Sequence, residues 1–323
     1  MARLLLRRLL QGIPLVLGVI VLNFTLIQLA PGSFLDVMTA EQQVSDPALI
    51  ARLRATYGMD QPLWMQLCHY IVSVAHFDLG FSYRQNMPVL DVILASLPGT
   101  LVLMLSSLLL ALLVGVAAGV ASAVKAGSLT DNLLSILAVL FFAAPGFWVG
   151  ILLIVLFSVK LGWLPVGGMS TLGAEGEGTV AAVLDVARHL VLPAVALGLF
   201  YAATYARVAR ASMLEVLGLD FVRTARAKGL GPAATVMRHV LRNAMLPIVT
   251  LFGLQIGTVL GGSVVIEAVF GWPGIGSLLL DSVESRNYPV VLGVLVLSSL
   301  LVIVVNILVD LAYLRLDPRV GGR

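Results

Sequence analysis

The sequence predicts an all-α integral membrane protein with six transmembrane helices. The chain of 323 residues is 59% hydrophobic and 11% charged, and its mean hydropathy of +1.03 is typical of integral membrane proteins. A helical crossing needs about 20 apolar residues. Six runs reach that length, at roughly 9–30, 99–122, 133–158, 190–209, 246–266 and 290–311. None of them alternates with period two, which favours helices over transmembrane strands.

The first run follows three cations, Arg3, Arg7 and Arg8. A cleaved signal peptide starts in the same way, but its apolar region is only about 7–15 residues long and ends at a small-residue cleavage site. The run from Leu9 to Ala30 is longer and shows no obvious site of that kind. We therefore expect a first helix that is retained.

The long connection 31–98 is expected to carry short helices on the membrane surface, and a plain loop is the alternative. Asp46–Pro47 has the form of a helix start, with a cap followed by proline, and Gly58 is a stop. Further helices are expected to start at 60–62 and at Pro88, the second of them leading into the second apolar run.

The cations predict the orientation of the chain. Fourteen of the 20 lysines and arginines lie in the two termini and in the second and fourth connections. Cytoplasmic loops carry an excess of such residues, so both termini and the fourth connection are predicted to be cytoplasmic. Six crossings also place both termini on one side, which agrees.

The apolar runs carry no ionisable residue in their central parts. Ion- and proton-coupled carriers need such groups at membrane depth, so a secondary carrier is disfavoured. The amides of Asn23, Gln28, Gln255 and Asn306 fit hydrogen bonding between helices, with pathway lining as the alternative.

Glycines at four-residue spacing let helix backbones approach closely, either within the chain or against a partner subunit. Gly115 and Gly119 form such a face in the second run, and Gly253 starts another in the fifth. The fifth run also supplies the candidate residues for pathway lining or helix packing, which are Gln255, Gly257, Thr258 and Gly261.

The sequence offers no catalytic, cofactor or metal site. None of Lys125, Lys160 and Lys228 completes a phosphate-binding loop, and the four histidines lack metal-ligand spacing. The glycine-rich segment 271–276 follows no strand, so we expect a tight turn with Trp272 at the membrane interface rather than a nucleotide site. Any use of ATP must then reside in another chain.

The fourth connection concentrates charge. The fourth run is expected to continue as an amphipathic helix to Gly218. Asp220 is expected to cap a short helix over 221–228 that ends at Gly229, and Pro232 opens the next helix. A short helix held between two longer ones can enter a groove on a soluble protein. A basic loop that only fixes topology or touches anionic lipid is the alternative.

Several segments form a distinctive set, namely Tyr57–Leu63, Asp78–Ser82, Gly162–Pro165, Arg223–Leu230, Arg238–Pro247, Glu267–Gly276 and Asp317–Arg319. Together they resemble type I ABC importer permeases along nearly the whole chain. They are most similar to the first permease of the oligopeptide, dipeptide and nickel group. The general permease loop has Glu-Ala-Ala where this chain has Arg223-Thr224-Ala225, so no role of that acidic position is carried over to Arg223.

The resemblance implies a MetI-like architecture with a structured extracytoplasmic loop between the first two helices. It divides the chain into a first helix with that loop at 1–94, a permease core at 95–311 and a cytoplasmic tail at 312–323. It also implies an ATPase-coupling loop formed by Asp220, Arg223, Thr224, Ala225, Arg226, Ala227, Lys228, Gly229 and Leu230. In this loop Ala225, Ala227 and Gly229 would allow close docking, and the cations would supply polar contacts.

The implied function is half of a translocation pathway in the bacterial inner membrane. The solute would be a peptide, a nickel chelate, glutathione or an opine. The implied partners are a second homologous permease, two cytoplasmic ATPases that hold ATP and magnesium, an extracytoplasmic binding protein and the lipid bilayer. No nucleic acid is expected, and this chain would be no enzyme. A stand-alone carrier or channel, or a scaffold without transport, is the alternative, and dependence on a partner ATPase separates them.

Overall fold

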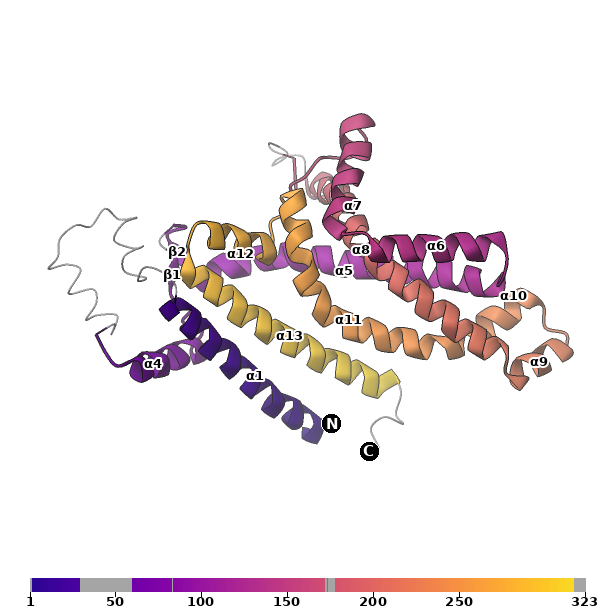
Figure 1. Cartoon of the computed structure of the whole chain (residues 1–323), viewed down its shortest axis with the longest axis horizontal. Coiled ribbons are helices and arrows are strands. Elements are labelled where there is room, and N and C mark those ends of the chain that lie inside the picture. The colour runs from indigo at the N-terminus through magenta and orange to yellow at the C-terminus, as the bar shows by residue number, and fades with distance from the viewer. Residues whose placement is uncertain (1, 30–59, 83, 172, 174–177, 317–323) are drawn as a thin grey trace. The chain divides into compact units, whose positions relative to one another are not determined.

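A computed structural model describes residues 2–29, 60–82, 84–171, 173 and 178–316 (Figure 1). The predicted cap and stop at 46–58 lie outside these residues. The helices are α1 (Ala2–Leu29), α4 (Leu63–Ala75), α5 (Val89–Val124), α6 (Leu129–Ala143), α7 (Gly146–Leu153), α8 (Thr179–Leu217), α9 (Asp220–Ala227), α10 (Pro232–Thr235), α11 (Leu241–Phe270), α12 (Ile275–Glu284) and α13 (Tyr288–Leu316). Two π-helical segments, Ile154–Lys160 and Val236–Val240, continue α7 and α10. Strands β1 (Phe81–Ser82) and β2 (Met87–Pro88) form a small antiparallel pair.

The mostly helical, membrane-spanning architecture is confirmed. Four described segments are long and apolar enough to cross a membrane, namely Val89–Val124, Thr179–Leu217, Pro232–Gly257 and Tyr288–Val309. There are up to six if each of two bent helix pairs is one crossing. The first predicted run contributes the shorter apolar stretch Leu10–Leu26. The count of six individual crossings therefore stays a prediction.

Two predicted helix boundaries are wrong. The third run is no single straight helix, because α6 ends at Ala143 and the following helix is bent away by 107°. Pro145 disfavours helical backbone at Ala144, which is extended with ψ 133°. Conversely, the short helix expected from Pro88 and the second run form one continuous helix, α5, with Pro98 inside it.

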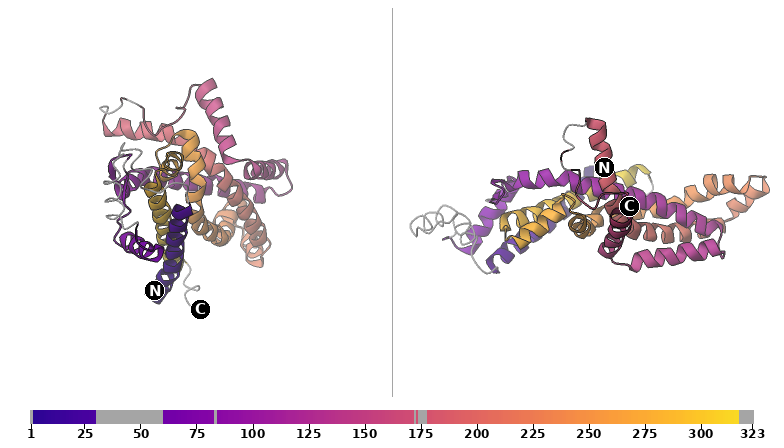
Figure 2. Two further views of the ribbon diagram at one scale, coloured as in Figure 1. Left: turned by 60° about the vertical axis from the view of Figure 1, so that its left-hand side comes forward. Right: turned by 90° about the horizontal axis from the view of Figure 1, so that it is seen from above.

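The chain divides into two compact units. One comprises Met1–Pro98 and Gly274–Leu308. In this unit α1 lies beside α13 (Figures 1 and 2), and the Nδ2 of Asn23 donates to the carbonyl of Leu292 at 3.5 Å. The amide of Gln28 likewise donates to Gln66 of α4. The structure therefore shows both amides in hydrogen bonds between helices, as expected from the sequence.

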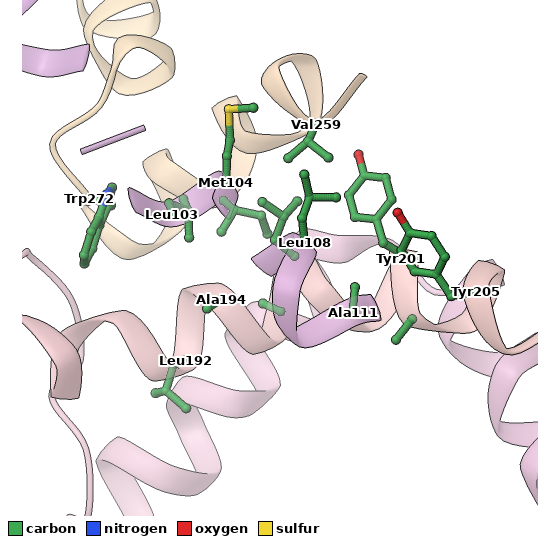
Figure 3. Close-up of a cluster of buried hydrophobic side chains, with 14 of the residues drawn as sticks. Leu103, Met104, Leu108, Ala111, Leu192, Ala194, Tyr201, Tyr205, Val259 and Trp272 are labelled. Carbon is green, nitrogen blue, oxygen red and sulfur yellow. The ribbon is translucent and has the colours of Figure 1, made fainter. Parts of the chain in front are cut away.

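The second unit comprises Gly99–Pro273 and Val309–Arg323, and α8 packs in it against α6, α7 and α11. Its core joins side chains of α5, α8 and α11, with Leu108, Tyr201 and Val259 meeting in Figure 3. The glycine face of α5 is an internal contact. A Cβ on Gly115 would lie 2.5 Å from the carbonyl oxygen of Ala202, and one on Gly119 would lie 2.6 Å from that of Ala206.

Candidate functional site

The short helix predicted in the fourth connection exists. Helix α8 ends at Leu217 with Gly218 as its C-cap, and α9 follows from Asp220 to Ala227. Pro232 then starts α10. Figure 1 shows α9 at the turn between the ends of α8 and α10. Local stop and start signals thus produce a helix of eight residues between two longer helical segments.

The predicted capping role of Asp220 is wrong. The N-cap is Leu219, and no side chain caps the helix. Asp220 instead lies in the first turn, where a negative charge interacts favourably with the helix dipole. Its side chain is exposed, and its Oδ1 lies 3.5 Å from the Nη1 of Arg223.

The end of α9 requires a glycine. Gly229 has a φ of +83°, a left-handed conformation that glycine adopts without steric cost. Its N–H donates to Arg226 O at 2.9 Å, and the N–H of Leu230 donates to Ala225 O at 3.3 Å. This pair of bonds is the Schellman arrangement, which satisfies carbonyls at a helix end and turns the chain sharply.

Helix α9 has one buried and one exposed face. Val222 and Ala225 are buried. Val222 belongs to a group of buried residues that we name the support cluster, made of Ala123, Met213, Val216, Val222, Val240 and Ala244. The exposed residues of α9 and its C-cap are Asp220, Phe221, Arg223, Thr224, Arg226, Ala227 and Lys228. Ala225 therefore lies on the inner face, away from any partner that docks on the outer one.

A buried carboxylate lies close to the support cluster. Asp131, in the first turn of α6, is 3% exposed. Arg210 of α8 donates to both of its oxygens, from Nε to Oδ1 at 2.7 Å and from Nη2 to Oδ2 at 2.9 Å. Ser122 of α5 also donates to Oδ1, and the N–H of Gly127 donates to Oδ2 at 2.9 Å. We name this set of contacts the Asp131 junction.

The turn between α5 and α6 prepares this junction. Gly127 has a φ of +79°, and Ser128 caps α6 by accepting the Asp131 N–H at 3.3 Å. The junction was not predicted from the sequence. A Ser-x-x-Asp pattern at 128–131 marks a helix start, but nothing local in the sequence identifies Arg210 as the partner.

The candidate pathway residues lie on α11. Gln255 and Gly257 are half-buried, and a Cβ on the exposed Gly261 would meet no atom within 4 Å. Thr258 lies on the same helix. Pathway lining and helix packing both stay predictions for these positions.

The turn predicted at 271–276 is confirmed, but the interfacial position of Trp272 is wrong. Gly271 ends α11 in the left-handed conformation. Trp272 is fully buried, and its Nε1 donates to Gly99 O at 2.8 Å. A tryptophan that anchors a helix among lipid headgroups exposes its ring, whereas this one fills the core. Beside it, the buried Glu267 accepts a 2.8 Å hydrogen bond from Thr100.

Comparison with known families gives two matches. The family described as "Binding-protein-dependent transport system inner membrane component" matches residues 111–322. The N-terminal family of such membrane components matches residues 1–104.

The similarity to known proteins extends over nearly the full chain. It is 43% identical to the di/tripeptide transport system permease protein DppB of Pseudomonas aeruginosa, over 97% of each chain. It is 39% identical to the oligopeptide transport system permease protein AppB of Bacillus subtilis, over 99% of each chain. The glutathione transport system permease protein GsiC of Escherichia coli is 41% identical over 97% of each chain.

Solved structures agree on the fold. An inward-facing structure of the MetNI methionine ABC transporter matches with a TM-score of 0.51 at 20% identity, over 68% of this chain and 94% of that chain. An amino acid ABC transporter chain matches with the same TM-score at 16% identity, over 70% and 94%. These matches confirm the predicted MetI-like permease architecture.

Proposed function

Because this chain belongs to the family of binding-protein-dependent transport system inner membrane components, we propose that α9 is the element through which a partner ATPase drives it. The chain is a permease component of a transport system, and its closely similar proteins are peptide and glutathione permeases. The observation that most directly supports the coupling proposal is that α9 has a buried apolar face and an exposed cationic face.

The two faces suit a helix that transmits force. The inner face, through Val222 and Ala225, fixes α9 to the chain, so a push on the helix moves what lies beneath it. The outer face presents Arg223, Arg226 and Lys228 to a partner. Surface charges of this kind contribute mainly to the rate and specificity of docking.

The proposed assembly follows from the family to which the chain belongs. Two cytoplasmic ATPases hold ATP and magnesium, a second homologous permease completes the pathway, and an extracytoplasmic binding protein delivers the solute. The charge distribution supports a cytoplasmic position for α9 and both termini.

We propose a short peptide as the solute. The relatives are named for di/tripeptide, dipeptide, oligopeptide and glutathione transport, and glutathione is itself a tripeptide. Nickel chelates and opines are the alternatives. Mass spectrometry of the ligand bound to the partner binding protein identifies the solute.

Charge reversal in α9 tests the coupling proposal. Arg226→Glu is compared with Lys160→Glu, which makes the same change at an exposed lysine predicted on the other side of the membrane. We expect Arg226→Glu to lower peptide uptake into proteoliposomes by about tenfold, the effect of about 1.4 kcal/mol of lost docking free energy. Less ATPase should also co-purify with it. Uptake equal to that of Lys160→Glu, or uptake without ATP, would refute the proposal in favour of a stand-alone carrier.

A further inference from the structure

We propose that Asp131 and Arg210 are positioning residues that fasten α6 to α8, so that movement of α9 reaches α5, α6 and α8 as one body. This inference rests on the proposed function of α9. It assigns the transmission of that movement to a specific contact, the Asp131 junction.

Helix α6 packs against α8, and the Asp131 junction supplies the buried polar part of that contact. The only buried residues of α6 are Asp131 and Ala138. Its large apolar side chains, including Leu129, Leu133 and Ile136, are exposed. In a membrane, lipid tails are as apolar as these side chains, so burying them against another helix gains little from the hydrophobic effect. Hydrogen bonds between helices therefore add to the packing of α6 on α8 and help to fix its position.

Those polar contacts converge on α8. The guanidinium of Arg210 binds both oxygens of Asp131, and such bidentate pairs fix orientation as well as distance. One turn earlier in α8, the guanidinium of Arg207 lies 4.0 Å from the ring centre of Phe142, near the other end of α6. Helix α6 is thus held to α8 at both of its ends.

The junction is continuous with the support of α9. Ser122, which donates to Asp131, directly precedes Ala123 of the support cluster. Along α8, Arg210 precedes Met213 of the same cluster by three residues, which is one helical turn. From Arg210 to the end of α8 at Leu217 the helix rises only about 10 Å. A force on α9 would therefore reach the Asp131 junction over a distance of about two helical turns of α8.

A purely structural role is the competing explanation, and a matched pair of variants separates the two. Asp131→Asn keeps the shape of the side chain but removes its charge. Asp185→Asn makes the same change near the start of α8, where Asp185 accepts hydrogen bonds from the N–H and hydroxyl of Thr171 at 2.6 and 2.7 Å. Both remove an ionised acceptor that holds α8 to a neighbouring segment, but only the first lies beside the support cluster.

The experiment measures ATP hydrolysis and peptide uptake by the complete transporter in proteoliposomes. We expect Asp131→Asn to assemble and hydrolyse ATP, but to carry about two- to thirtyfold less peptide per ATP, the range found for residues that carry coupling. Asp185→Asn should keep the wild-type ratio. An unchanged ratio in Asp131→Asn, or an equal loss in Asp185→Asn, would overturn the inference.

If Asp131→Asn fails to assemble, Arg210→Lys is measured in the same way, since it keeps the charge and loses the bidentate geometry. A lowered ratio in Arg210→Lys supports the inference, and a wild-type ratio or failed assembly overturns it. The proposed function is judged separately. If Arg226→Glu lowers uptake while Asp131→Asn keeps the ratio, α9 remains the coupling element and only the junction loses its role.

Discussion

Helices α9 and α12 are both short and both connect longer helices, yet the chain holds them differently. Helix α9 buries Val222 and Ala225 and exposes arginines. Helix α12 buries its start at Ile275 and Gly276 and also Ser282 near its end.

The connection that leaves α12 is fixed by polar contacts. The N–H of Asn287 donates to Ser282 O at 2.7 Å, and its Nδ2 donates to Ser82 and Gln85, each at 2.9 Å. Helix length and a position between longer helices therefore do not identify a docking element. What distinguishes α9, the proposed docking element, is an exposed cationic face over buried apolar residues, whereas the exposed charges of α12, Asp281 and Glu284, are acidic.

The largest expected effect is the loss of stability when the buried face of α9 is disrupted. Val222 is fully buried, so Val222→Asp places an unpaired charge among apolar side chains, and we expect the transporter to lose at least roughly 4 kcal/mol of stability. Thermal unfolding in detergent measures this. Ala227→Asp, on the exposed face of the same helix, is the control and should leave the midpoint nearly unchanged. Equal midpoints for the two variants would show that α9 has no buried face.

The next largest effect is the loss of stability when the hydrogen bonds that hold the end of α12 are removed. Asn287→Ala removes two side-chain hydrogen bonds at a position that is 8% exposed, which costs roughly 1–3 kcal/mol. The unfolding midpoint should fall, while the peptide carried per ATP stays unchanged. Asn306→Ala, at an exposed amide of α13, is the control. If Asn287→Ala carried less peptide per ATP while its unfolding midpoint stayed unchanged, α12 would act in coupling as α9 is proposed to do.

A smaller effect is expected at the end of α9. Gly229→Ala forces a side chain into the left-handed conformation at a cost of roughly 1–2 kcal/mol, although no neighbouring atom obstructs the added Cβ. Gly231→Ala is the matched control, since Gly231 has a φ of −62° and equally open surroundings. Uptake should fall in the first variant alone. A matching loss in both would mean that the Schellman turn does not set the position of α9.

The smallest effect on stability is expected on the outer face. Arg223→Ala removes an exposed side chain and should change stability by less than about 0.5 kcal/mol. ATPase co-purification should nevertheless weaken and lose part of its dependence on salt, because exposed charges are screened by ions. The same change at the exposed Glu284 of α12 should leave that salt dependence as it is. An unaltered dependence for Arg223→Ala would argue against docking on this face.

The boundaries of α9 were predictable because their causes are local. Gly218, Gly229 and Pro232 act on the backbone within one turn of the chain. The inward placement of Ala225 was also within reach, since Val222 and Ala225 are three residues apart and so share a helix face.

The long-range contacts of the second unit were not predictable, because they join residues far apart in the chain. Asp131 and Arg210 are separated by 79 positions, and Trp272 and Gly99 by 173. Each residue alone looks ordinary: an acid at a helix start, an arginine in a basic connection and a tryptophan near a span. The bend at Pro145 was hidden for another reason, since the mean apolarity of a run does not register one proline.

The contact of α5 with α8 through Gly115 and Gly119 limits how these helices can move. Each glycine lies so close to an α8 carbonyl that a single added carbon would overlap with it. Rotation of α8 about its own axis would bring side chains into that space, so we expect the two helices to move together. Such a pair can tilt or translate as a unit, and a movement passed from the proposed coupling helix to one end of α8 would then carry α5 with it.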